Sequence, residues 1–226
     1  MTAADMTDAP IRDAATLIVL DRDAADGPSV LMGQRGANAV FMPSKSVFPG
    51  GAVDAADAAF QADLPPDLLR LLQAEPRAGS GVTPHAIVAA ALRELLEETG
   101  LMTGSPGHAP QGWDRYAAAG LAPDASRLTF MFRAITPPGR TRRFDARFLL
   151  LDATHIHGDR HDFSAADDEL SHLHWVPLAK ARALDLPFVT EVVLAEIAQI
   201  AASGRQPDSV PFFDNRGAQP RFTRIA

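Results

Sequence analysis

Hydrophobic residues along the chain fall into short runs and into longer stretches with helical spacing. Short apolar runs bounded by glycine, proline or aspartate are typical of β-strands. Such runs predict strands at 15–20, 29–35, 47–51, 128–135, 144–151 and 172–176. The polar turn at 21–28 predicts a hairpin between the first two strands, and we expect the strands at 128–135 and 144–151 to pair.

The most clearly marked helix spans residues 84–99. Thr83 stands at the N-cap position, Pro84 lies in the first turn and Gly100 follows the last turn. These residue types begin and end helices. Further helical segments are predicted at 178–183 and 190–202. Because strands and helices are interspersed, an α/β sandwich is the simplest architecture.

Prolines and glycines interrupt residues 58–82 and leave room for one short helix at 67–73. We therefore predict an insertion at 58–82. The start of the chain is polar and alanine-rich, so residues 1–13 are predicted to be a disordered tail and residues 14–226 a single domain. After Gly204 no element is predicted, which makes the strand at 172–176 the last one.

Composition narrows the classes of function. The formal net charge is -7 and the pI is about 5.4, so no overall positive field attracts nucleic acid. The chain has no cysteine, which excludes disulfides, thiolate zinc sites and a cysteine nucleophile. We recognise no secretory signal and no apolar run of the roughly 20 residues that span a membrane. The expectation is a cytoplasmic protein with no membrane partner.

Three glutamates share one face of the predicted helix. At 100° per residue, Glu94, Glu97 and Glu98 lie within an arc of about 100°, opposite an apolar face. A solvated surface is the ordinary explanation of such a pattern. However, no lysine or arginine is expected four residues away on this arc to offset the repulsion among the glutamates. Hard oxygen ligands on a rigid helix suit Mg²⁺ or Mn²⁺, which would remove that repulsion.

The residues around these glutamates resemble a known motif. Residues 93–101, Arg-Glu-Leu-Leu-Glu-Glu-Thr-Gly-Leu, match the second half of the Nudix box, R-E-U-x-E-E-x-G-U, at every specified position. Gly51 to Asp57 approximates the first half, G-x5-E, with aspartate in place of glutamate. Between Asp57 and Arg93 there are 35 residues, more than the family pattern has. An insertion of this kind is tolerated because loop length costs little free energy.

The resemblance implies a Nudix-type α/β/α sandwich, with a mixed sheet and an insertion between the diglycine loop and the catalytic helix. It implies that Mg²⁺ or Mn²⁺ is bound by the carbonyl of Gly50 and by Glu94, Glu97 and Glu98. Arg93 would orient a glutamate by a charge-assisted hydrogen bond, while Gly51 and Asp57 would support the ligands. The cation would neutralise a diphosphate and activate water, whose proton passes to a carboxylate.

Two carboxylates are candidates for this base. One is Glu94 on the helix. The other is Glu169, which follows Asp167 and Asp168 and precedes the predicted strand at 172–176, as an acidic residue does in many members of the family. The competing interpretation of these three adjacent acids is a solvated loop.

A basic stretch at 140–145 suggests a substrate site. Arg142 and Arg143 suit phosphate oxygens and Phe144 suits a base, although a solvated turn is the alternative. This stretch, the segment 47–51 with its following acids, and the insertion are similar to the peroxisomal coenzyme A diphosphatase branch of the Nudix family. That resemblance implies hydrolysis of coenzyme A or acyl-coenzyme A. The chain does not end in an S-K-L type address, so a bacterial-type cytoplasmic relative fits better.

Other functions stay open at this stage. The partner is expected to be a small nucleoside diphosphate derivative, and ADP-ribose or NADH are alternatives to coenzyme A. A non-catalytic Nudix-fold module that senses a nucleotide is a further alternative, although such modules usually lose the glutamates. A homodimer is compatible with the sequence.

Overall fold

The computed structural model describes residues 9–37, 42–205, 208–217 and 219–226. Within them a mixed sheet of nine strands has the order β11-β10-β7-β8-β1-β2-β3, with β4 paired to β1 and β9 to β2. The strands are β1 (Ile11–Asp21), β2 (Ser29–Arg35), β3 (Ser46–Val47), β4 (Gly50–Ala52), β7 (Thr129–Ile135), β8 (Arg143–Asp152), β9 (Leu170–Pro177), β10 (Val210–Asp214) and β11 (Arg221–Ile225).

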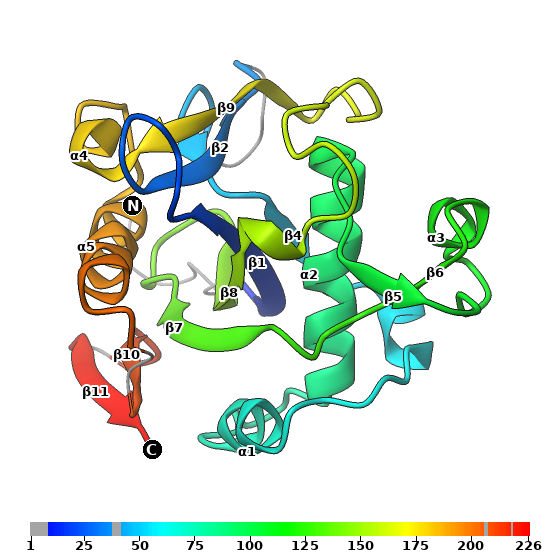
Figure 1. The fold of residues 1–226 in the computed structure, drawn as a ribbon. Helices are drawn as coiled ribbons and strands as arrows, with labels where there is room; N and C mark the ends of the chain where they lie inside the picture. The colour runs from blue at the N-terminus through cyan, green and yellow to red at the C-terminus, as the bar shows by residue number, and fades with distance from the viewer. Residues whose placement is uncertain (1–8, 38–41, 206–207, 218) are drawn as a thin grey trace.

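Helices cover both faces of this sheet, which makes the fold an α/β/α sandwich (Figure 1). The α-helices are α1 (Pro66–Gln73), α2 (Pro84–Thr99), α3 (Asp114–Ala118), α4 (Leu178–Ala181) and α5 (Phe188–Ser203). Short 3-10 turns lie at η1 (Ala55–Ala59) and η2 (Ala153–His155), and β5 (Gly104–Pro106) pairs with β6 (Leu121–Pro123) in a separate small sheet.

Side chains along β1 point alternately into two hydrophobic cores. Leu17 and Val19 pack with α2 on one side, whereas Ile18 and Leu20 pack with α5 on the other. Successive strand residues point to opposite faces, so a strand covered on both sides is apolar at nearly every position. This explains the continuous run at 15–20 and confirms the predicted sandwich with a mixed sheet.

The predicted hairpin between β1 and β2 is present, but it is not the longest pairing of β1. β1 and β2 are antiparallel neighbours, with registered pairs Leu20↔Val30 and Asp21↔Ser29 beside the turn. The longer partnership of β1 is parallel, with β8. The predicted antiparallel pairing of β7 with β8 is confirmed.

Two predictions at the chain ends are wrong. The strand predicted at 172–176, observed as β9, is not the last, because β10 and β11 follow it at the sheet edge beyond β7. The tail predicted for 1–13 also extends too far, since Ile11 to Asp13 belong to β1. Residues 1–8 lie outside the described residues.

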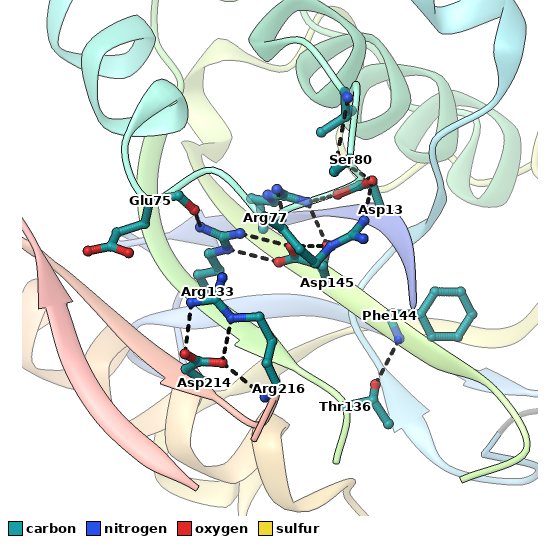
Figure 2. A network of polar contacts seen from close by, with 12 residues as sticks. Asp13, Glu75, Arg77, Ser80, Arg133, Thr136, Phe144, Asp145, Asp214 and Arg216 are labelled. Carbon is teal, nitrogen blue, oxygen red and sulfur yellow. Dashed lines mark hydrogen bonds and ion pairs between the residues drawn. The ribbon is translucent and has the colours of Figure 1, made fainter. Parts of the chain in front are cut away.

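The segment 58–82 is built into the fold. It contains α1, as predicted, and buries Leu68 and Leu72 in the core beneath α2. Figure 2 shows its second anchor, a buried network at the start of β1 and β8. Here Arg77 donates to Asp13 at 2.6 Å and to Asp145 at 3.1 Å.

Arg133 of β7 completes this network. It donates to both oxygens of Asp145 at 2.8 Å and to the carbonyl of Glu75 at 2.7 Å. The side chains of Arg133 and Asp145 are buried. Residues 58–82 are therefore held by charge-assisted hydrogen bonds as well as by apolar contacts.

None of the helices in the described part of the chain combines the length and the hydropathy of a membrane-spanning segment.

Candidate functional site

Capping residues define both ends of α2, the helix that carries the glutamates. The Thr83 hydroxyl accepts a hydrogen bond from the Ala86 N–H at 3.1 Å, and Pro84 occupies the first turn. Gly100 adopts φ 78°, and its N–H donates to the Leu96 carbonyl. A left-handed conformation at this position favours glycine. The predicted helix boundaries of 84 and 99 are confirmed.

The glutamate face of α2 packs against β4. The Gly50 N–H donates to Glu98 Oε2 at 2.7 Å. At Gly51 a Cβ atom would lie 2.2 Å from Glu94 Oε1. Because no heavy-atom contact tolerates that distance, the absence of a side chain at Gly51 allows the Glu94 carboxylate to lie against the strand. The diglycine loop and the helix therefore meet closely.

Arg93 joins the two halves of the motif. Its guanidinium contacts both oxygens of Asp57 at 3.1 Å and donates to the Ala52 carbonyl at 3.1 Å. It also donates to Glu94 Oε1 and to Glu97 Oε2, each at 2.9 Å. Charge-assisted hydrogen bonds of this kind fix the orientation of the carboxylates. Residues 58–82 thus leave the two halves in contact.

The glutamate face is not the solvated surface that is the ordinary explanation of its pattern, because Glu94 is 9% and Glu98 1% exposed, although Glu97 is exposed. The expectation that no lysine or arginine offsets the repulsion on this face needs correction. A cation also lies on it, since Arg93 forms an ion pair with Glu97 four residues away. Arg93 therefore offsets part of the repulsion that was expected to be removed by a bound metal ion alone.

Burial perturbs two of the glutamates strongly. Burial raises the pKa of Glu94 to about 7, opposed by the charge and hydrogen bond of Arg93. Burial also raises the pKa of Glu98 to about 9, opposed by the Gly50 N–H and by the charge of Arg35. Perturbed carboxyl groups of this kind concentrate at functional sites.

Glu169 lies close to the same face. Its negative charge raises the pKa of both Glu94 and Glu98. Its Oε1 accepts a hydrogen bond from Arg35 Nη2 at 2.8 Å. The Glu169 side chain is 54% exposed, so it combines proximity to the glutamates with access to solvent.

The loop before β9 is tied to the end of α2. The Asp167 N–H donates to the Glu97 carbonyl at 2.8 Å. Arg115 donates to the carbonyls of Leu96 and Ala165, both at 3.0 Å. Arg35 and Arg115 were not predicted as site residues, because an isolated arginine carries no sequence signal before its neighbours in space are known.

The carboxylates suit a hard divalent cation. Within the described part of the chain, the buried Glu98 Oε1 has no hydrogen-bond partner, which is costly unless a ligand completes the site. Oxygen donors on a helix and a strand match the preference of Mg²⁺ and Mn²⁺. As the side chains stand, with Arg93 bound to Glu94 and Glu97, no three His, Asp or Glu side chains of the described residues already form a metal site.

The predicted substrate residues lie elsewhere. Arg143 is buried and donates to the carbonyls of Thr136 and Asn215, so it holds strand ends together and the prediction of a substrate role fails for it. The Phe144 N–H donates to the Thr136 hydroxyl (Figure 2). Arg142 is exposed and keeps its role as a prediction.

The register of the sheet separates this stretch from the glutamates. Ile11 of β1 lies opposite Arg143, whereas Thr16 lies opposite Gly50. Five residues along a strand span roughly 16 Å. The stretch that includes Arg143 is thus not brought beside the diglycine.

Comparison with known proteins supports the fold. No protein-family model matches the chain. A Nudix hydrolase structure from Alicyclobacillus acidocaldarius is similar, with 29% identity over 86% of this chain and 96% of that chain and a TM-score of 0.58. The Nudix hydrolase RenU from M. smegmatis has 16% identity over 87% of this chain and 89% of that chain, with a TM-score of 0.44. The Nudix domain of Shewanella oneidensis NrtR, solved with ADP-ribose, has 12% identity over 84% of this chain and 88% of that chain, with a TM-score of 0.46.

The first of these similarities and the order of the strands define the same class of fold. The fold is the α/β/α sandwich of the Nudix hydrolases.

Proposed function

We propose that the chain is a metal-dependent hydrolase that cleaves the diphosphate linkage of a nucleoside diphosphate derivative in the cytoplasm, with coenzyme A and acyl-coenzyme A as its substrates. One observation carries the proposal. Arg93 holds Glu94 and Glu97 beside Glu98 on a single helix and, through Asp57, ties that helix to the diglycine loop.

The residues have separate parts in this chemistry. Glu94, Glu97, Glu98 and the Gly50 carbonyl would hold Mg²⁺ or Mn²⁺. When bound, the cation would supply neutralisation of the diphosphate and activation of water. Arg93 and Asp57 keep the glutamates in place, and Gly51 gives Glu94 room against the strand.

Glu169 is the proposed general base. It is exposed enough to exchange a proton with solvent, and it lies near Glu94 and Glu98. A base must reach the proton that it accepts, and a carboxylate on the loop facing α2 meets that requirement better than Glu94, which is bound by Arg93.

The substrate assignment rests on resemblance. Residues 47–51, the acids Asp54 and Asp57, and the segment 58–82 carry the similarity to the coenzyme A diphosphatase branch. The stretch 142–145 no longer adds to it, because Arg143 and Asp145 have structural partners. Exposed Arg142 is the remaining candidate for a substrate phosphate.

A substrate panel tests the proposal. The protein is assayed with Mg²⁺ and with Mn²⁺ on coenzyme A, acyl-coenzyme A, ADP-ribose, NADH and dinucleoside polyphosphates, and products are identified by mass in ¹⁸O-labelled water. We expect phosphopantetheine or its acyl form together with adenosine bisphosphate, one of them carrying a single ¹⁸O atom. Preferred cleavage of ADP-ribose or NADH would replace the substrate assignment. Binding without turnover of any compound would favour the nucleotide-sensing module.

A further inference from the structure

We propose that Arg35 is a positioning residue that holds the Glu169 carboxylate toward the glutamate face of α2. The inference rests on the proposed function, in which Glu169 is the base. In this role Arg35 affects catalysis by orienting Glu169 and does not contact the substrate.

The sheet places the two residues side by side. β2 and β9 are antiparallel neighbours, and Arg35 lies opposite Leu170, the residue that follows Glu169. Arg35 Nη2 donates to Glu169 Oε1 at 2.8 Å. The Arg35 side chain is 20% exposed, against 54% for Glu169. The arginine is thus the anchored member of the pair, and the glutamate is the member with freedom to move.

Electrostatics explains why Glu169 needs an anchor. When ionised, Glu169 repels the glutamates of α2, and the bond from the Asp167 N–H to the Glu97 carbonyl keeps its loop beside that helix. An exposed side chain relieves such repulsion by rotating into solvent. Arg35 opposes this rotation through its hydrogen bond to Glu169 Oε1. Arg93 does not replace it, because its guanidinium is bonded to Asp57, Glu94 and Glu97.

The backbone of the loop has its own supports. The Asp167 N–H is bonded to Glu97, and Arg115 is bonded to Ala165. A Cβ on Gly100 would lie 3.0 Å from the Ala165 carbonyl carbon, so the loop lies directly on the end of α2. Loss of the Arg35 side chain should therefore release the carboxylate of Glu169 and leave the loop in place.

The orientation of Arg35 is not explained by stability alone. Its Nε atom is buried and has no hydrogen-bond partner among the described residues. A buried donor without an acceptor costs free energy, and a partly exposed ion pair contributes little in return. The side chain is nevertheless oriented with Nη2 toward Glu169. This orientation is expected if the direction of that carboxylate matters for catalysis.

A double-mutant cycle tests the inference. Arg35→Gln, Glu169→Gln and the double variant are compared in kcat and KM, with Arg35→Lys as the conservative replacement. We expect Arg35→Gln to lower kcat by about 10- to 100-fold, because a misplaced base loses most of its effect. KM should change little, and Arg35→Lys should restore part of kcat. In the Glu169→Gln background, Arg35→Gln should lower kcat no further.

The matched control is Arg22→Gln, which removes a partly exposed ion pair with Asp152 at 3.1 Å. It should leave kcat unchanged. Equal effects of Arg35→Gln with and without Glu169 would overturn the inference, and so would an effect confined to KM. Absence of hydrolysis by the wild-type protein would count against the proposed function.

The ¹³C chemical shift of the Glu169 carboxyl group tests the positioning by Arg35 even in that case. This signal should shift in Arg35→Gln and not in Arg22→Gln. An unchanged signal overturns the positioning role.

Discussion

Asp57 receives two hydrogen bonds from Arg93, each at 3.1 Å, although the two residues lie 36 positions apart. Asp57 is buried on η1, and Arg93 is on α2. Arg93 Nη1 also donates to Glu94 and to Glu97, so one guanidinium contacts Asp57 and both glutamates. The pair is therefore the connection between the diglycine segment and the glutamates.

Replacement of Asp57 tests this connection. Asp57→Asn keeps the shape of the side chain but removes its charge and one acceptor, so Arg93 should turn toward the glutamates. We expect the affinity for Mg²⁺ to fall by about 10- to 100-fold, as for other residues that orient metal ligands. The measurement is the Mg²⁺ dependence of hydrolysis, with Asp63→Asn at an exposed position as the control. An unchanged Mg²⁺ requirement would show that Asp57 has no part in the site.

Gly51 offers a steric test. A methyl group in Gly51→Ala would have to displace the Glu94 carboxylate, because its Cβ would lie 2.2 Å from Oε1. Crowding of this kind costs typically about 1–3 kcal/mol. We expect lower stability in urea and a larger loss of metal-dependent hydrolysis. The control is Gly81→Ala, since a Cβ there meets nothing within 4 Å. Wild-type activity in Gly51→Ala would place Glu94 away from β4.

The buried glutamates predict a pH dependence of stability. Glu94 and Glu98 have ordinary pKa values of 4.5 when unfolded, and about 7 and about 9 in the folded protein. Between these values the folded protein binds more protons than the unfolded chain, so the free energy of unfolding falls as pH rises. The thermal midpoint of the metal-free protein should therefore decrease from about pH 5 to pH 9.

Divalent cations should reverse this trend. Mg²⁺ competes with protons for the carboxylates, so its stabilising effect should grow with pH. Thermal unfolding with EDTA or with Mg²⁺ measures both effects. Glu98→Gln should flatten the metal-free profile, whereas Glu191→Gln on the surface of α5 should not. A flat profile for the wild-type protein would contradict the assigned pKa values.

The network in Figure 2 predicts the role of residues 58–82. Asp145 is fully buried and bonded to Arg133 and Arg77. Asp145→Asn would leave the buried guanidinium of Arg133 without its counter-charge, and loss of one partner of a buried pair costs about 3–5 kcal/mol. We expect reduced stability in urea and faster proteolysis within 58–82. Asp67→Asn, at an exposed ion pair with Arg70, should do neither. Equal stability of the two variants would show that the network does not hold the segment.

The sequence predicted the helices and strands whose ends and buried faces depend on nearby residues in the chain. The cap residues Thr83 and Gly100 fixed α2 to the residue, and apolar runs located β1, β2, β7 and β8. The motif identified the glutamates. These features depend on neighbours along the chain, which a sequence displays directly.

Long-range packing set the features that were missed. β10 is a short strand that adds to β7 in parallel, and no local pattern indicates such a partner. Arg143 looked like a phosphate ligand because its neighbours are basic, yet it is buried against backbone carbonyls. Arg35 and Arg115 gain their roles only when β2, α3 and the loop before β9 meet around α2.

The glutamate face of α2 is the centre of the account, and Glu98→Gln tests it most directly. Burial raises the pKa of Glu98 to about 9, so the metal-free side chain is protonated at neutral pH and glutamine resembles it. The variant should keep the thermal midpoint of the wild-type protein at pH 7 in EDTA. Its Mg²⁺-dependent hydrolysis of the best substrate should fall by at least about 100-fold, as expected when the cation that would stabilise the transition-state charge loses a ligand. A folded Glu98→Gln protein with wild-type Mg²⁺-dependent turnover would contradict the account.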